Sequence, residues 1–265
     1  MNWTEAIALE QLDQHRFTAT VGEEWSSLQG VHGGYVAALA VAAAERVLVA
    51  EGVDAATTLR AATFGYVSGN RLGALEIEVE VVRRGRAMIA SHVRVAQDGR
   101  TTTVARLHHS TPWDGPAYSD APPPPDRPDG LVPLDSTGRA NHLANVHTLL
   151  HPDTTVFAGA DRSEWLAWCR PRHGSPIDAT WLTMFGDYFP PAVFTRVTGP
   201  NRAVTIEYAI QIHSAAGSWA LGDHDELVAR MHTFHSADGF AVEDGWIWLP
   251  DGALLATTRQ TRLAG

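Results

Sequence analysis

Two groups of residues in this chain are of types that bind or transform ligands. Arg83, Arg84 and Arg86 flank Gly85 between two alternating stretches, and forked guanidinium donors at such a turn are suited to binding phosphate groups. A solvated charged turn has the same composition, so both interpretations stay open. All 20 basic residues are arginine. The absence of lysine excludes Schiff-base, pyridoxal-phosphate and phosphate-loop chemistry, because each of these needs a primary amine.

The second group consists of 13 histidines and one cysteine. His147 and His151 are four residues apart, but the HTLLH motif lacks the glutamate of a zinc-protease helix. His232 and His235 lie in an alternating stretch, where their offset places them on opposite faces of a strand. Cys169 alone forms neither an internal disulfide nor a thiolate cage. We therefore expect no metal site, and a buried or half-buried free thiol at Cys169.

Composition limits the remaining classes of function. The net charge of −10 argues against general nucleic-acid binding, and no apolar run approaches the roughly 20 residues of a membrane span. The amino terminus lacks a basic start followed by an apolar core, so we expect a cytoplasmic protein without membrane association. The sequence has no G-x-S-x-G elbow and no G-x-G-x-x-G after a strand, which disfavours a serine hydrolase and a dinucleotide-binding fold.

A proline-rich segment divides the chain into halves of similar length. Residues 112–140 contain four successive prolines together with glycine and aspartate, a composition typical of a stiff, extended linker. We therefore predict an amino-terminal domain over residues 1–111 and a carboxy-terminal domain over residues 141–265.

The two halves repeat one order of elements. In the first half we predict an apolar helix from His32, a strand from Thr58, and two long alternating strands over 74–99 and 100–109. In the second half we predict a helix that starts at Ser175 and ends near Asp187. The predicted strands of the second half cover residues 205–217, 226–252 and 253–265.

The second-half helix has its own start signal. Ser175, Pro176 and Asp178 form a pattern of a cap, a first-turn proline and a reciprocal acid. About three turns separate this start from Asp187, and two prolines follow. An acid at the end of a helix gains nothing from the helix dipole, so we expect the pKa of Asp187 to be somewhat raised.

The turns and strands together resemble a known fold. A D-G turn joins the last two strands of each half, Asp98-Gly99 in the first and Asp251-Gly252 in the second. A long apolar helix wrapped by a curved antiparallel sheet resembles the hotdog fold, and two linked copies resemble the double hotdogs of the acyl-CoA thioesterase II family. The resemblance covers nearly the whole chain except the linker and the first ~15 residues. It implies an α+β double hotdog.

The same resemblance implies an activity, the hydrolysis of acyl-CoA-type thioesters to a free acid and a thiol without metal or organic cofactor. In that family a carboxylate, a hydroxyl and a glutamine hold the attacking water, and the matching residues here are Asp187, Thr205 and Gln260. The carboxylate accepts the water's proton while the other two groups orient it. Paired hotdogs leave sheet edges and apolar faces exposed, so we expect a homodimer or a higher homo-oligomer.

Two further sets of residues are implied by resemblance. His32-Gly33-Gly34 opens the first-half helix, and related thioesterases use an HGG-like turn to supply backbone donors for the thioester oxygen. The resemblance therefore implies Gly34 and Tyr35 as these donors. The alternative is that the glycine only permits close packing between helix and sheet. Arg83, Arg84 and Arg86 are the candidates for the phosphates of coenzyme A.

An internal comparison assigns the predicted site to the second half. Superposing Thr58 on Thr205 places an alanine-rich stretch opposite Asp187, and counting from the D-G turns places Leu107 opposite Gln260. The first half would then keep the threonine but lack the carboxylate and the amide. We therefore expect one functional site in each chain.

Two other functions fit the same elements. A hotdog hydratase acting on enoyl thioesters needs an aspartate and a histidine five residues apart at a helix start, and neither predicted helix has that D-x-x-x-x-H pattern. A non-catalytic acyl-CoA binding protein would keep the fold and lose turnover, and thiol release from acyl-CoA separates it from the enzyme.

Overall fold

The computed structural model describes residues 2–134, 140–172, 177–199, 202–214, 218–222 and 224–265. A sheet of 13 strands runs in the order β1-β2-β6-β7-β8-β5-β13-β17-β16-β15-β11-β10-β9. The α-helices are α1 (Trp3–Ala6), α2 (Gly33–Ala50), α3 (Ala179–Phe185) and α4 (Val193–Arg196), and short 3-10 helices cover Glu23–Trp25 and Asn141–Asn145.

The strands fall into two sets. The first-half strands are β1 (Glu10–Gln11), β2 (Arg16–Val21), β5 (Thr58–Tyr66), β6 (Gly73–Arg84), β7 (Ile89–Gln97) and β8 (Arg100–Ser110), with β3 (Ser26–Ser27) and β4 (Gly30–Val31) as a separate pair. The second-half strands are β9 (Val132–Pro133), β10 (Val146–Leu150), β11 (Glu164–Pro171), β13 (Ala203–Ile212), β15 (Leu227–Ala237), β16 (Phe240–Trp248) and β17 (Leu254–Ala264), with β12 (Ile177–Asp178) and β14 (Ser218–Trp219) as another pair.

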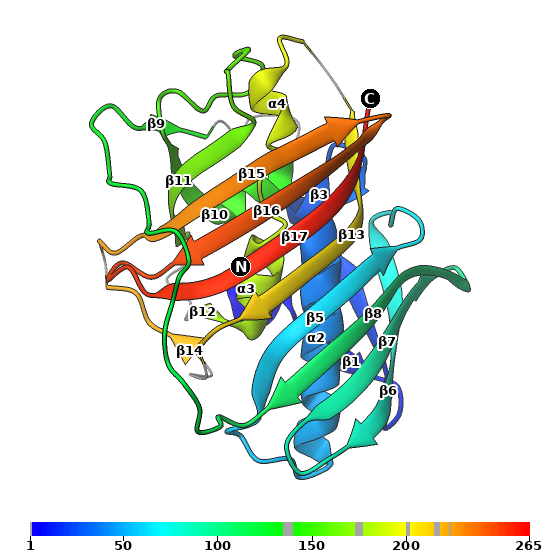
Figure 1. Ribbon diagram of the computed structural model, residues 1–265. Coiled ribbons are helices and arrows are strands. Elements are labelled where there is room, and N and C mark those ends of the chain that lie inside the picture. The colour runs from blue at the N-terminus through cyan, green and yellow to red at the C-terminus, as the bar shows by residue number, and fades with distance from the viewer. Residues whose placement is uncertain (1, 135–139, 173–176, 200–201, 215–217, 223) are drawn as a thin grey trace.

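The two halves join edge to edge into one curved sheet. Strands β5 and β13 pair antiparallel at the seam, with Gly65 opposite Glu207 and Ala61 opposite Gln211. Helices α2 and α3 lie side by side on the inner face of this sheet (Figure 1). The structure therefore has the predicted architecture of two units, each with one core helix and an antiparallel sheet around it.

Helix α2 is long because its sequence favours a fully buried helix. Its 18 residues are rich in alanine, with no interior proline, and 13 of them are buried. The His32 side chain caps its start by accepting a hydrogen bond from the Tyr35 N–H. The stretch is apolar over a length that would cross a membrane, but 72% of it is buried inside the protein. Its apolarity is thus explained by the sheet around it.

Two segments predicted as single strands each form a hairpin. Residues 74–99 divide into β6 and β7 around Gly85, and residues 226–252 divide into β15 and β16 at Asp238-Gly239. Asp238 and Gly239 both have positive φ, 53° and 78°, as a tight two-residue hairpin turn requires. The predicted hairpin turn at Asp98-Gly99 is confirmed, with φ of 53° and 74°.

Helix α3 is shorter than the sequence predicted. Ser175 and Pro176 lie outside the described residues, while Ile177 and Asp178 pair with β14, so the helix begins only at Ala179. Asp178 is its N-cap, and its carboxylate accepts a hydrogen bond from the Trp181 N–H at 2.8 Å. The helix ends at Phe185, two residues before Asp187.

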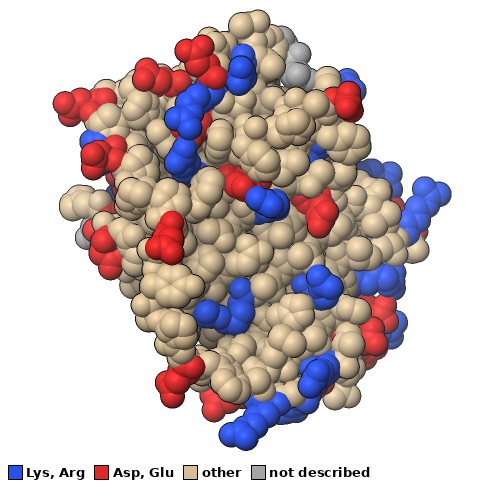
Figure 2. Space-filling model, viewed as in Figure 1, with Lys and Arg blue, Asp and Glu red and all other residues tan. Residues whose placement is uncertain are grey.

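The proline-rich segment packs along the second half of the sheet. Arg127 forms an ion pair with Glu226 just before β15, at 3.0 Å. Leu131 packs against an outer-face apolar cluster in which Trp168 and Trp248 are buried. Trp248 is therefore a core residue. On the same outer face, charged side chains are scattered among uncharged ones (Figure 2).

The close approach of α2 to α3 depends on Gly34. A Cβ atom at this position would lie 2.5 Å from the Met184 backbone oxygen and 3.0 Å from the Asp187 Cβ. We predict that Gly34→Ala lowers the free energy of unfolding by about 1–3 kcal/mol, because the two helices must separate. Urea denaturation of the variant measures this loss.

Gly65→Ala is the matched control for this experiment. Its new Cβ would meet nothing closer than 3.4 Å, an ordinary contact with Val104 Cγ2. Its unfolding free energy should stay within about 0.5 kcal/mol of the wild type. Equal losses in the two variants would contradict the packing argument.

Candidate active site

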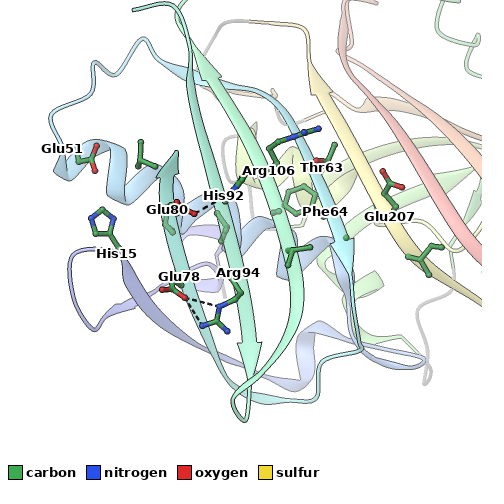
Figure 3. Close-up of a pocket in the computed structure, with 17 residues that line it drawn as sticks. His15, Glu51, Thr63, Phe64, Glu78, Glu80, His92, Arg94, Arg106 and Glu207 are labelled. Atoms are coloured by element: carbon green, nitrogen blue, oxygen red, sulfur yellow. Dashed lines mark hydrogen bonds and ion pairs between the residues drawn. The ribbon is translucent and has the colours of Figure 1, made fainter. Parts of the chain in front are cut away.

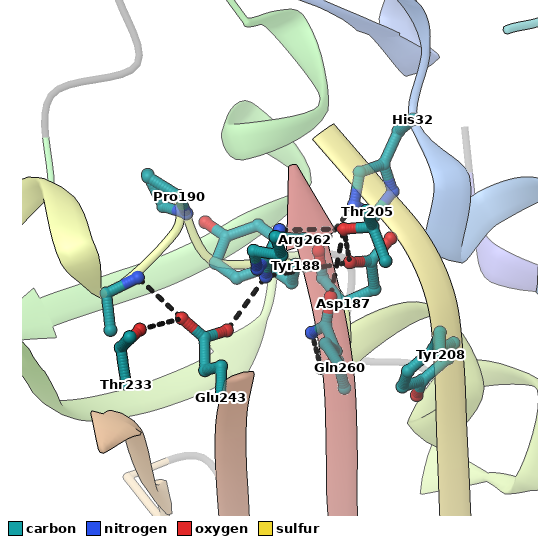
Figure 4. A network of polar contacts seen from close by, with 12 residues as sticks. His32, Asp187, Tyr188, Pro190, Thr205, Tyr208, Thr233, Glu243, Gln260 and Arg262 are labelled. Atoms are coloured by element: carbon teal, nitrogen blue, oxygen red, sulfur yellow. Dashed lines mark hydrogen bonds and ion pairs between the residues drawn. The ribbon is translucent and has the colours of Figure 1, made fainter. Parts of the chain in front are cut away.

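The three residues predicted to hold a water lie together at the end of α3. Asp187 occupies the turn after this helix, Thr205 lies on β13 and Gln260 on β17 (Figure 4). The Thr205 hydroxyl is 3.3 Å from Asp187 Oδ1 and 3.0 Å from Gln260 Oε1. The Gln260 amide donates to the Gly186 backbone oxygen at 3.2 Å. The structure thus joins the three side chains in one hydrogen-bonded group.

A buried arginine that the sequence analysis missed completes this group. Arg262 is 4% exposed, and its Nη1 donates to the Thr205 hydroxyl at 2.7 Å. Its Nη2 lies 2.8 Å from Glu243 Oε1 and 3.8 Å from Asp187 Oδ1. The alternation of β17 could have indicated this residue, because Gln260 and Arg262 are two positions apart and share a face.

Glu243, also missed, anchors the far side of Arg262. Its side chain is 1% exposed and accepts hydrogen bonds from the Ala192 N–H at 2.6 Å and the Thr233 hydroxyl at 3.3 Å. A buried carboxylate with three donors is well satisfied. One guanidinium therefore holds two buried carboxylates, Glu243 as a structural partner and Asp187 at the candidate site.

The environment of Asp187 raises the pKa of its carboxyl group to about 6. Burial is the main cause, since it disfavours the charged form, and the nearby Arg262 opposes it by favouring that form. The sequence analysis expected a raised pKa from the helix end. The direction agrees, but burial is the dominant cause. A carboxyl group with this pKa is ionised at neutral pH and still basic enough to accept a proton.

Residues of the first half fix the Asp187 backbone. His32 Nδ1 accepts a hydrogen bond from the Tyr35 N–H, so its Nε2 carries the proton and donates to the Asp187 backbone oxygen at 2.9 Å. The His32 ring stacks on His142 with 4.1 Å between the ring centres. Burial is the main cause that lowers the pKa of His32 to about 4 and that of His142 to about 3, so both rings are neutral. The site is therefore built from both halves.

The two backbone candidates for the thioester oxygen differ in the structure. The Tyr35 N–H already donates to His32, and the Tyr35 side chain belongs to the core, stacked on Trp25. Gly34 lies in the first turn of α2, where N–H groups have no partner within the helix. It also packs tightly on Met184, so close packing accounts for this glycine independently of any ligand. Gly34 is the better placed of the two.

The predicted phosphate-binding arginines are not brought to this site. Arg83, Arg84 and Arg86 are exposed at the β6–β7 turn, and Arg84 contacts Glu51 at the end of α2. Asp187 lies at the opposite end of this 18-residue helix, which spans about 27 Å. A carrier bound at Asp187 in the same subunit therefore meets these arginines only if it reaches along the whole helix.

The register of the strands corrects one internal match. Strands β5 and β13 each contain a bulge, at Arg60 and Ile206. Aligning the bulges places Leu59, not Thr58, opposite Thr205, while Leu107 does match Gln260. The first half thus lacks the threonine as well as the other two groups. The earlier match paired two threonines by residue type, whereas the equivalent bulges fix the register one residue away.

A further bulge, at Phe234 in β15, corrects the placement of two histidines. His232 pairs with Asp244 and His235 with Val242, so both lie on one face of β15, because Phe234 is an extra residue between them. In the described part of the chain, no three His, Cys, Asp or Glu side chains are grouped as metal ligands. Cys169 is buried as a free thiol.

A groove of about 1110 Å³ lies elsewhere, on the outer face of the first-half sheet (Figure 3). Its charged lining includes the Arg94–Glu78 pair at 2.9 Å and the His92–Glu80 pair at 4.0 Å. The predicted catalytic residues line neither this groove nor a crevice of about 30 Å³ beside Trp181. They lie on the inner face, where Thr205 is partly exposed.

Comparison with known proteins identifies the family. The model of the acyl-CoA thioesterase N-terminal domain matches residues 21–110, and that of the C-terminal domain matches residues 117–264. The chain belongs to the acyl-CoA thioesterase family. An uncharacterised protein of Mycobacterium tuberculosis is 26% identical to this thioesterase over 225 residues, covering 72% of this chain and 76% of the relative.

Solved structures show the same fold. A hotdog-fold protein of unknown function from Alicyclobacillus acidocaldarius superposes on this thioesterase with a TM-score of 0.87 and 21% identity, covering 99% of this chain and 97% of the other. An acyl-CoA thioesterase II, TesB2, from Mycobacterium marinum superposes with a TM-score of 0.75 and 18% identity, covering 99% and 97%. The predicted double-hotdog fold is thereby confirmed.

The buried ion pair of Arg262 should contribute strongly to stability. Arg262→Met leaves Glu243 buried without its cation, so we predict a loss of about 3–5 kcal/mol in unfolding free energy. Arg259→Met, on the same strand, removes only an exposed pair with Asp244 and should cost at most about 1 kcal/mol. Urea denaturation compares the variants, and similar losses would argue against the buried network.

The raised pKa of Asp187 also predicts how stability depends on pH. The folded protein holds this proton more tightly than the unfolded chain, so the contribution of Asp187 to stability falls as pH rises from 3.8 to about 6. Asp187→Asn should remove this component. We predict that the difference in unfolding free energy, wild type minus variant, decreases across this window and is flat above it. A difference that is constant with pH would show that Asp187 titrates normally.

Proposed function

We propose that this thioesterase hydrolyses acyl-CoA thioesters by direct attack of a water molecule held by Asp187, Thr205 and Gln260. The observation that carries the proposal is the hydrogen-bonded group of these three side chains around a carboxyl group with a pKa of about 6. Membership of the acyl-CoA thioesterase family supports the substrate class.

The proposed reaction balances with these groups alone. The water oxygen bonds to the thioester carbonyl carbon while Asp187 takes one water proton, and the carbonyl π electrons move to its oxygen. The tetrahedral intermediate then collapses, the carbon–sulfur bond breaks, and the leaving thiolate takes the proton from Asp187. The products are a carboxylic acid and a thiol, and the aspartate is restored.

Thr205 has a clear role in this scheme. Its hydroxyl accepts a hydrogen bond from Arg262 and lies within reach of both Asp187 and Gln260. A hydroxyl that accepts from a fixed cation directs its own proton toward the carboxylate or the amide oxygen. Thr205 therefore holds the Asp187 carboxylate and the Gln260 amide oxygen in position. These side chains do not need to rearrange when a water molecule binds.

The carrier, the assembly and the location complete the proposal. We expect an acyl-CoA or another acyl thioester as the substrate, a homodimer or higher homo-oligomer, and a cytoplasmic location. Because Arg83, Arg84 and Arg86 lie at the far end of α2, a role in binding phosphates would require a long reach or a second subunit of the assembly.

Thiol release from a panel of acyl-CoAs of increasing chain length, followed with a thiol reagent, tests the function. We predict that Asp187→Asn lowers kcat by about 10²- to 10⁴-fold, because the base is lost. Thr205→Val and Gln260→Leu should each lower it by about tenfold, the effect of one hydrogen bond. Wild-type activity should rise with pH through about 6 and then level, since Asp187 acts when ionised.

Asp244→Asn is the matched control, because it makes the same chemical change in an outer-face ion pair of the sheet. Its kcat should stay within about twofold of the wild type. Saturable acyl-CoA binding without thiol release by the wild type would support the binding-protein alternative and refute the proposed hydrolysis.

A further inference from the structure

We propose that Tyr66, a residue of the first half, is a further catalytic residue whose hydroxyl donates a hydrogen bond to the thioester carbonyl oxygen. This inference rests on the proposed hydrolysis at Asp187. It is based on the buried Tyr66 hydroxyl, which has no hydrogen-bond partner in the described part of the chain and lies beside Gly33, as does the Asp187 carboxylate.

Tyr66 differs from the other buried tyrosines. Tyr35 donates to the Ala6 backbone oxygen at 2.6 Å, Tyr188 to Leu143 at 3.0 Å, and Tyr208 to Thr183 at 3.0 Å. The Tyr66 hydroxyl is buried and has no hydrogen-bond partner among the described residues. An unpaired buried hydroxyl costs stability, and this one lies beside the candidate base, where a bound substrate would supply an acceptor.

The hydroxyl lies beside the free side of the candidate base. An ideal Cβ at Gly33 would lie 3.2 Å from the Tyr66 hydroxyl oxygen and 2.9 Å from Asp187 Oδ2, so these two oxygens are at most about 6 Å apart. In the described part of the chain, the polar contacts of the Asp187 carboxylate are made by Oδ1, with Thr205 and Arg262. Oδ2 therefore faces Gly33 and Tyr66.

The strand register explains why Tyr66 reaches this point. Tyr66 is the last residue of β5, and its neighbour Gly65 pairs with Glu207, two residues after Thr205. Its side chain shares the inner face with Phe64, two positions earlier. The seam between the halves thus places a first-half phenol beside the second-half carboxylate.

The pattern of exposure indicates the side from which substrate arrives. Three residues, Gly33, Tyr66 and Thr205, are partly exposed. Asp187 and Gln260 are buried, with 7% and 1% of their surface exposed. A thioester that enters between Gly33 and Tyr66 meets Asp187 Oδ2 on one side and the phenol on the other. The glycine leaves the space that any side chain at position 33 would fill.

The chemistry assigns a donor role to the phenol. Burial, and then the nearby Asp187, raise the pKa of Tyr66 well above its usual value, so it keeps its proton. As water attacks, negative charge develops on the carbonyl oxygen, and the Tyr66 hydroxyl stabilises this charge without transferring its proton. Charge returns to the carbon–oxygen bond when the thiolate leaves.

Tyr66→Phe tests the inference with the acyl-CoA thiol-release assay. We expect kcat to fall about 100-fold, with KM changed less than about threefold and the acidic limb of the pH profile unmoved near 6. A kcat within threefold of the wild type overturns the inference. So does a variant in which the acidic limb moves up by half a pH unit or more with little loss of kcat, because Tyr66 would then act on Asp187 and not on the substrate.

Tyr208→Phe is the matched control, since it removes a phenol hydroxyl that already donates to the Thr183 backbone oxygen in α3. It should lower the melting temperature and leave kcat within about threefold. Tyr66→Phe should not lower the melting temperature, because its hydroxyl has no partner to lose. If the wild type releases no thiol from any acyl-CoA, the proposed function fails. If Tyr66→Phe keeps a wild-type kcat while Asp187→Asn loses activity, the function stands and this inference alone fails.

Discussion

The guanidinium of Arg262 is the interaction on which the site depends. It is buried among Glu243, Thr205 and Asp187, and it ties β17 to β16 and β13 as well as to the turn after α3. Removing a cation from water is costly unless carboxylates and acceptors pair with it, and here both Nη atoms have such partners. The same cation lowers the pKa of Asp187 and so opposes the rise that burial causes. Arg262 therefore both stabilises the fold at this point and influences the pKa of Asp187.

The duplicated architecture shows how one site was kept and the other lost. In the first half, Leu59, Leu107 and His109 occupy the positions of Thr205, Gln260 and Arg262. His109 is buried, and burial lowers its pKa to about 4, so it carries no charge there. The first half therefore lacks the cation that holds the Asp187 carboxyl group, and residues 40–44 of its helix, which correspond to Asp187, contain no carboxylate.

The sequence predicted the repeat and helix α2, because periodicity and the D-G turns are local signals. The three grouped side chains were implied by the resemblance to the thioesterase II family. It did not predict the bulges at Arg60, Ile206 and Phe234, which shift side chains by one position and depend on pairing between distant strands. Arg262, Glu243 and His142 were missed for a related reason. Each is recognisable only by its burial beside partners far away in the chain, such as Ala192 for Glu243 and Tyr188 for His142.

The seam between β5 and β13 has an evolutionary consequence. His32, Gly33 and Gly34 from one half contact Asp187 from the other, so neither repeat carries a complete site. An ancestor with two equivalent subunits would have had two such sites. Fusion into one polypeptide allowed the repeats to diverge into complementary roles, one supplying the support and the other the reactive carboxylate. Each repeat therefore depends on the other for a complete site.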